Sequence, residues 1–124
     1  MNSRALILFA HGARDPRWAE PFLRLQRLIA AQLPQVEVAL AYLELMQPSL
    51  PDLVDRFVQG GCRDVTVVPV FFGRGGHVAR DLPLLADGLR NKHLDLTLRV
   101  AGAVGEDADV LAAMARYCVG SLLL

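Results

Sequence analysis

The sequence is poor in cysteine and lysine and has no long apolar run. Its 124 residues include two cysteines, Cys62 and Cys118, and a single lysine, Lys92. Two cysteines without a CxxC pair cannot form a disulfide framework or a zinc site, so both are predicted to be small buried residues in a reducing compartment. No apolar run approaches the roughly 20 residues that span a bilayer, and the first residues do not resemble a signal peptide. The sequence therefore predicts a soluble, cytoplasmic protein without a membrane partner.

An excess of charge of one sign is also missing. Thirteen Lys and Arg residues balance thirteen Asp and Glu residues, which leaves a formal net charge of zero. This balance argues against nucleic acid as a partner, because such proteins carry a basic surface. A hydrophobic content of 53% rules out disorder and predicts a buried core. The length favours a single domain covering residues 1–124.

Segments typical of strands and helices alternate along the chain. Apolar stretches predict strands at residues 5–10, 36–43, 65–72 and 94–101. Apolar residues at helical spacing predict helices at about residues 16–33, 50–60, 78–91 and 107–119, with Ser49 as the N-cap of the second. Four such units predict a parallel sheet with right-handed crossovers.

The apolar content of each strand predicts its place in the sheet. The first and third strands are the most apolar and are expected at the centre, whereas polar Asp95, Thr97 and Arg99 indicate that the fourth is an edge strand. Pro69 predicts a bulge or an unpaired point in the third strand, because proline has no N–H to donate. The expected fold is a three-layer α/β domain of flavodoxin-like type, with strand order 2-1-3-4 and helices on both faces.

Chemically active side chains follow three of the predicted strands. His11 directly follows the first strand, Glu44 the second, and His77 the third after a glycine-rich loop. Ligands bind beyond the carboxyl ends of parallel strands, and two imidazoles with a carboxylate suit Co²⁺, Fe²⁺, Ni²⁺ or Zn²⁺. Each residue alone has a structural explanation, as a hydrogen-bonded histidine or a solvated acid, but their alignment favours a metal site. His93 lies in a polar turn and is predicted to be solvated.

Arginine and glycine are concentrated at the same edge. Guanidinium groups pair bidentately with carboxylates or phosphates, and a glycine-rich loop before a helix can host an anion. The candidate substrate-binding residues are therefore Arg14, Arg74, Gly75, Gly76 and Arg80. The loop does not match GxGxxG and no P-loop lysine is present, which argues against a dinucleotide or a nucleoside triphosphate. An ordinary surface position remains the alternative for the arginines of the first helical turns.

Three motifs in this order resemble a known family. They are residues 11–16 (HGARDP), residues 42–50 (YLELMQPSL) and residues 67–73 (VVPVFFG), the last followed by residues 76–78 (GHV) and 81–83 (DLP). Together they resemble the small CbiX-type class II chelatases, the sirohydrochlorin cobaltochelatase and ferrochelatase family. Two residues depart from the family pattern: Ala13 stands where serine is common, and Met46 where a smaller residue is usual. The first departure removes a hydroxyl beside the expected site.

The resemblance implies an enzyme with a chelatase-like fold. The implied reaction is ATP-independent insertion of Co²⁺, or of Fe²⁺ or Ni²⁺, into sirohydrochlorin during cobalamin or siroheme synthesis. His11, His77 and Glu44 would bind the metal substrate and act in catalysis, no cofactor would be tightly bound, and arginines would face the eight carboxylates of sirohydrochlorin. A neutral imidazole can also accept a pyrrole proton, whereas a protonated one cannot bind metal, so activity is expected to fall below about pH 6.

The short chain bears on the expected assembly. Larger relatives in this family have two such halves facing one cleft, which together with the apolar residues 122–124 implies a homodimer. Two other functions stay open, a non-catalytic carrier of a tetrapyrrole or a metal, and a flavodoxin-like phosphate-binding or receiver-type domain. The latter is disfavoured because no acidic pair ends the first strand. Catalytic turnover would separate the enzyme from the carrier.

Overall fold

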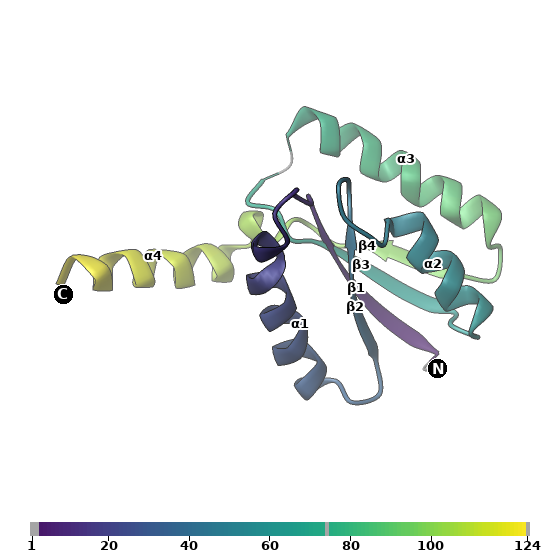
Figure 1. Cartoon of the computed structure of the whole chain (residues 1–124), viewed down its shortest axis with the longest axis horizontal. Coiled ribbons are helices and arrows are strands. Elements are labelled where there is room, and N and C mark those ends of the chain that lie inside the picture. The colour runs from purple at the N-terminus through teal and green to yellow at the C-terminus, as the bar shows by residue number, and fades with distance from the viewer. Residues whose placement is uncertain (1–2, 74, 124) are drawn as a thin grey trace.

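The centre of the structure is a sheet of four parallel strands. The computed structural model describes residues 3–73 and 75–123, without the side chains of residues 76, 77, 79 and 123. The strands are β1 (Arg4–Ala10), β2 (Glu37–Tyr42), β3 (Asp64–Pro69) and β4 (Thr97–Val100). They lie in the order β2-β1-β3-β4, as predicted, and every neighbouring pair is parallel (Figure 1).

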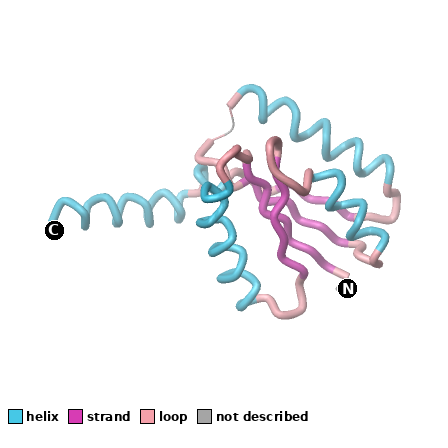
Figure 2. Tube along the Cα trace, in the orientation of Figure 1, coloured by secondary structure: helices cyan, strands magenta, loops and turns pink. Residues whose placement is uncertain are grey.

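Helices lie on both faces of this sheet, as the pattern predicts. The α-helices are α1 (Glu20–Gln32), α2 (Leu50–Gln59), α3 (Gly76–Lys92) and α4 (Ala108–Leu123), with short 3₁₀ helices η1 (Pro16–Ala19) and η2 (Val104–Glu106). The helix predicted from residue 16 therefore begins as a 3₁₀ turn, capped by the Asp15 side chain. Figure 2 shows α2 and α3 on one face and α1 on the other, while α4 extends away from the sheet.

Two apolar layers hold the sheet between its helices. Ile7 and Phe9 of β1 pack with Val65 and Val67 of β3 under α2 and α3. The alternate side chains of β1, Leu8 among them, face α1. β1 is therefore buried on both faces, which is why it reads as a continuous apolar run.

Capping and proline set several element boundaries. The Ser49 Oγ accepts a hydrogen bond from the Asp52 N–H at 3.3 Å, which confirms Ser49 as the N-cap of α2. Pro69 is the last residue of β3, opposite Phe9, so it ends the strand instead of forming a bulge within it. The strand predicted at residues 65–72 therefore ends earlier, at Pro69. The strand predicted at residues 94–101 is also shorter in the structure, where β4 covers Thr97–Val100.

The two cysteines lie in different environments. Cys62 is buried as predicted, and its thiol donates to the Ser3 carbonyl at a sulfur–oxygen distance of 3.3 Å. Cys118 is exposed, so the prediction of a buried residue was wrong there, because it lies on α4 and α4 projects into solvent. In the described part of the chain, no helix combines the length and hydropathy needed to cross a membrane.

His93 is mostly buried and paired, which corrects the prediction that it is solvated. Its side chain is 15% exposed, and its Nε2 lies 2.7 Å from Asp55 Oδ1 on α2. The neighbouring Lys92 Nζ donates to Asp55 Oδ2 at 2.8 Å. These bonds from Lys92 and His93 hold the pKa of Asp55 below its usual value of 3.8 and join the end of α3 to α2.

We expect Asp55→Asn to remove an acid-sensitive part of the stability. A carboxylate whose pKa is lowered by folding stabilises the protein above its unfolded-state pKa, and this contribution is lost as the pH falls through the folded-state pKa. The wild type should exceed the variant by about 1 kcal/mol in unfolding free energy at neutral pH. Urea unfolding at several pH values should show this difference shrinking toward about pH 3. A difference independent of pH would contradict the assignment.

Candidate functional site

The site is built where β1 and β2 end side by side. Ala10 pairs with Tyr42 at the last position of the two strands. The pairing continues into the loops, because the Leu43 N–H donates to the Ala10 carbonyl at 2.9 Å and the Glu44 N–H to the His11 carbonyl at 3.1 Å. As a result, His11 Nε2 lies 3.1 Å from Glu44 Oε1. The structure therefore brings together two of the three residues that were predicted as metal ligands.

Gly12 allows the two loops to approach this closely. Its φ of +97° lies in the left-handed region, and a Cβ at this position would stand 1.8 Å from the Glu44 carbonyl oxygen. No residue with a side chain fits there without moving the loop that carries Glu44. Sequence reasoning missed this positioning role, although a glycine directly after the histidine that ends a buried strand is a signal that could have indicated it.

An aromatic side chain supports the imidazole from the β3 side. The His11 ring meets Phe71 edge to face, with centroids 6.3 Å apart, and Phe71 in turn packs against Phe9 of the core. The side chains of His11 and Glu44 are nonetheless 53% and 55% exposed. Their polar atoms are thus held in place from behind while remaining accessible to a ligand from solvent.

The third predicted ligand lies at the start of α3. Gly75 is the N-cap residue of this helix, Gly76 its first residue, and the His77 backbone belongs to its first turn. The His77 side chain and the whole of Arg74 lie outside the described residues. Within the described set, no three His, Cys, Asp or Glu side chains converge as a metal-binding group.

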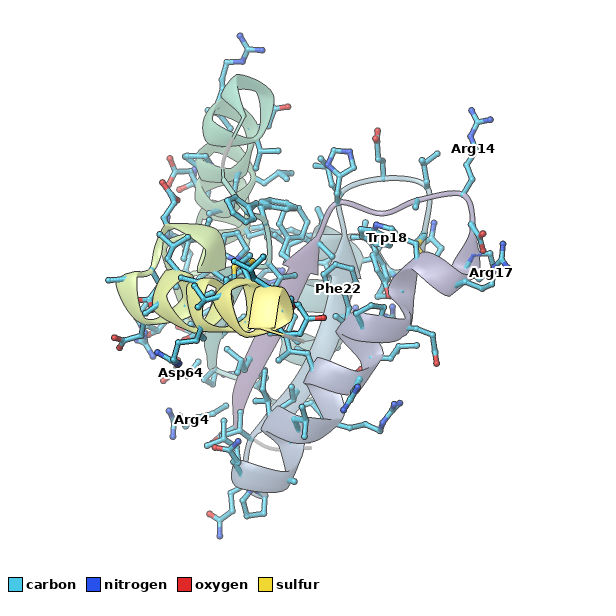
Figure 3. All side chains as sticks on the ribbon, turned by 90° about the vertical axis from the view of Figure 1, so that its left-hand side faces the viewer. Arg4, Arg14, Arg17, Trp18, Phe22 and Asp64 are labelled. Carbon is cyan, nitrogen blue, oxygen red and sulfur yellow. The ribbon has the colours of Figure 1, made fainter. Side chains whose placement is uncertain are left out.

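The arginines near the site differ in their contacts. Arg17 donates to the Asp15 carboxylate at 2.7 Å, and this contact lowers the pKa of Asp15. Arg14 is exposed, and its side chain points away from the body of the protein (Figure 3). Arg80 is also exposed, with its Nε 3.9 Å from Asp81 Oδ1. Arg14 and Arg80 are both accessible to an anionic ligand, although Arg80 also has a long ion pair with Asp81, and Arg17 is paired closely with Asp15.

Among the side chains that the structure describes, none encloses the His11–Glu44 pair, which is about half exposed at the carboxyl edge of the sheet. Two apolar cavities of about 610 and 520 Å³ lie elsewhere, the first beside α1 and the second between α2 and α3. Neither is lined by His11 or Glu44. An imidazole nitrogen and a carboxylate oxygen are donors suited to a borderline divalent ion, and either group can accept a proton. Because these groups lie on an exposed edge, they can be reached by a ligand that is too large to enter a closed pocket.

Relatives with similar sequences are sirohydrochlorin cobaltochelatases. The chain is 33% identical to that of Methanocaldococcus jannaschii over 91 residues, which cover 72% of this chain and 62% of the relative. It is 30% identical to that of Methanococcus maripaludis over 79 residues, which cover 64% of this chain and 55% of the relative. The matched part thus spans less than two thirds of the length of either relative.

Solved structures share the fold. A CbiX protein from Marinobacter aquaeolei VT8 superposes with a TM-score of 0.84 and 33% identity, over 96% of this chain and 97% of that one. The sirohydrochlorin chelatase SirB from Bacillus subtilis, in complex with cobalt, superposes with a TM-score of 0.77 at 19% identity, over 94% of this chain and 49% of that one. The model of the CbiX family matches residues 5–118. Since this match covers most of the sequence, the chain belongs to the CbiX family.

Proposed function

We propose that this protein inserts a divalent metal ion into sirohydrochlorin without ATP, and that Co²⁺ is the preferred ion. The observation that carries the proposal is the His11–Glu44 pair, held at the open carboxyl edge of the sheet. Membership of the CbiX family and relatives named sirohydrochlorin cobaltochelatases support the choice of substrate. Metal ion and tetrapyrrole are both substrates here, so no resident cofactor is needed.

The spacing of the pair suits two ligands of one metal ion. With metal–ligand bonds of about 2.1 Å, a nitrogen and an oxygen 3.1 Å apart subtend an angle of roughly 95° at the metal. This angle is close to the octahedral value, so the ion can bind His11 and Glu44 without moving either side chain far. Because β3 is parallel to β1 and α3 follows the carboxyl end of β3, we assign His77 as a further ligand.

Metal insertion also requires proton acceptors. The entering ion replaces two pyrrole N–H protons, so two N–H bonds break while bonds form from those nitrogens to the metal. The His11 imidazole and the Glu44 carboxylate can each accept a proton and pass it to solvent, because both are about half exposed. The pair would thus deliver the ion and receive a proton at the same position.

The surroundings fit a polyanionic macrocycle. Arg14 and Arg80 are exposed, and we assign them, with Arg74, to the substrate carboxylates. The N-terminal end of α3, at Gly75 and Gly76, presents backbone N–H groups that can also bind a carboxylate. Substrate binding would then depend on ionic strength more strongly than metal binding does.

We also propose that two copies act together in the cytoplasm. The described residues leave His11 and Glu44 about half exposed, and the fold of this chain accounts for about half of a SirB chain. A second copy would therefore supply the missing side of a cleft for a large macrocycle. Both cysteines are free thiols, which fits a reducing compartment.

A metalation assay tests the proposed function directly. Sirohydrochlorin in large excess over protein is mixed with Co²⁺, Fe²⁺ or Ni²⁺, with and without ATP, and the absorbance change of the macrocycle is followed. We expect many turnovers per protein molecule, the highest rate with Co²⁺ and no effect of ATP. A change limited to one equivalent of protein would instead identify a carrier, and the absence of any change would contradict both functions.

A further inference from the structure

Two exposed apolar residues flank the His11–Glu44 pair along the carboxyl edge of the sheet. Leu45 directly follows Glu44 on the loop after β2 and is 59% exposed. Phe72 directly follows Phe71 on the loop after β3 and is 69% exposed. The strand that carries His11 at its end, β1, lies between β2 and β3. Leu45 and Phe72 therefore lie on opposite sides of His11.

Leu45 is strained as well as exposed. Its φ of +66° lies in the left-handed region, which glycine, asparagine and aspartate adopt but a leucine rarely does. A single exposed leucine is common on protein surfaces and needs no explanation. An exposed leucine in a strained conformation is different, because asparagine would reduce the strain there and would expose no apolar side chain. Backbone outliers of this kind gather at ligand-binding and catalytic sites.

The backbone beside Phe72 is fixed from two sides. The Gly105 N–H of η2 donates to the Phe71 carbonyl at 2.9 Å, and a Cβ at Gly105 would stand 1.7 Å from the Phe72 carbonyl oxygen. On the other side, the Phe71 ring contacts the rings of Phe9 and His11. Phe72 itself remains mostly exposed. An aromatic residue on a backbone that is already ordered loses less conformational entropy when a ligand covers it.

The separation of these two residues fits a flat ligand with several rings. Neighbouring strands lie about 4.8 Å apart, so the ends of β2 and β3 are separated by roughly 10 Å across β1. A tetrapyrrole macrocycle can cover this distance, whereas a single aromatic ring cannot. Such a macrocycle carries its carboxylates on the rim and has a flat conjugated face. Arginines can bind the rim, but the face requires apolar or aromatic partners.

We propose that Leu45 and Phe72 bind the face of the macrocycle and hold its central nitrogens over His11 and Glu44. This inference rests on the proposed function, because it takes sirohydrochlorin as the ligand. Neither side chain can bind a metal ion or accept a proton, so both act in binding alone. Loss of such a contact should raise KM and change kcat little, whereas loss of a metal ligand should lower kcat.

Titration of metal-free sirohydrochlorin, followed by its absorbance, tests these contacts without metal insertion. We expect Leu45→Asn to raise Kd about 10-fold and Phe72→Ala about 30-fold, whereas Phe72→Tyr keeps an aromatic face and should stay within about twofold of wild type. The losses should be equal at low and high ionic strength, because salt screens charges and not apolar contacts. Leu45→Asn should also raise the thermal midpoint by about 2 °C through relief of strain. A purely structural role for Leu45 would not combine higher stability with weaker binding.

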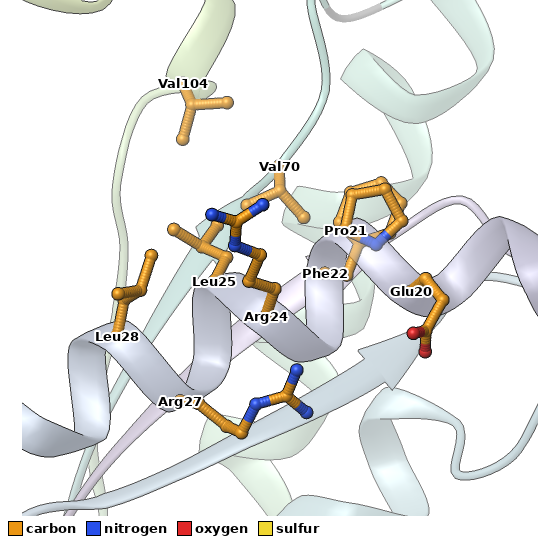
Figure 4. A pocket seen from close by; sticks show the side chains of 9 residues that line it. All are labelled: Glu20, Pro21, Phe22, Arg24, Leu25, Arg27, Leu28, Val70 and Val104. Atoms are coloured by element: carbon orange, nitrogen blue, oxygen red, sulfur yellow. The ribbon is translucent and has the colours of Figure 1, made fainter.

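Two control variants carry the same substitution at other exposed leucines. Leu94 is 86% exposed and precedes the amino end of β4, and Leu28 is 56% exposed and lines the cavity beside α1 (Figure 4). Leu94→Asn and Leu28→Asn should both keep the wild-type Kd. The inference is overturned if Leu45→Asn and Phe72→Ala bind as wild type does, or if Leu28→Asn weakens binding as much as they do.

Metal insertion by the wild type separates the two possible failures. Normal turnover together with unchanged Kd values in Leu45→Asn and Phe72→Ala would overturn this inference and leave the proposed function intact. A wild type that neither binds nor metalates sirohydrochlorin would contradict both.

Discussion

His11→Ala is expected to reduce the rate of metal insertion into sirohydrochlorin by roughly 100-fold or more. The substitution removes the imidazole that lies 3.1 Å from Glu44, and with it one metal ligand and one proton acceptor. Since the His11 side chain is half exposed, its loss should leave the fold intact. The initial rate with Co²⁺, followed by absorbance at catalytic protein concentration, measures the effect.

The His93–Asp55 pair offers a matched control for this result. His93 also contacts a carboxylate, that of Asp55, but it precedes the amino end of β4 and lies at the opposite end of the sheet. His93→Ala should therefore retain the wild-type rate per folded molecule, even if its thermal midpoint falls. A normal rate for His11→Ala, or an equal loss in both variants, would contradict the assigned role of His11.

Gly12→Ala is expected to lower both the stability and the activity of the protein strongly, although it adds only one methyl group to the site. The new Cβ would stand 1.8 Å from the Glu44 carbonyl oxygen, and the residue would keep a φ of +97°. Either the loop that carries Glu44 moves or the strand end shifts, and the His11–Glu44 contact is lost in both cases. We expect a loss of about 3 kcal/mol or more in unfolding free energy, together with loss of activity.

Gly61→Ala separates backbone strain from steric collision. Gly61 follows α2 with a φ of +98°, nearly the same as Gly12, but nothing lies within 4 Å of the position of its Cβ. This variant should lose about 1 kcal/mol and keep its activity. Urea unfolding of the two variants beside wild type gives the comparison. Equal losses would mean that the contact between Gly12 and Glu44 is not what constrains the loop.

Much of the sheet could be predicted because burial leaves a local pattern in the sequence. β1 is buried on both faces and reads as a continuous apolar run, whereas β4 at the edge alternates polar and apolar residues. Element ends were less accurate, since the strand predicted through residue 72 ends at Pro69. Where a ladder stops depends on the pairing partner, which the pattern of one strand does not contain.

The proximity of His11 and Glu44 also follows from the chain order. Parallel strands end at the same edge, so residues that follow β1 and β2 meet there whatever their separation in sequence. The contact between Gly12 and the Glu44 backbone could not be foreseen in this way. It depends on the backbone conformation of two loops, which the hydropathy pattern of the sequence does not specify.

The sequence by itself determined the strand order, the covered and exposed faces of the strands, and the edge at which His11 and Glu44 meet. Tertiary structure alone decided that His93 is paired with Asp55, that Cys118 is exposed, and that α4 stands away from the sheet. The physical reason is the same for all three. The hydropathy of a side chain indicates how much free energy its burial would contribute. Whether the side chain is buried depends on a partner surface, which comes from another part of the chain or from a second copy.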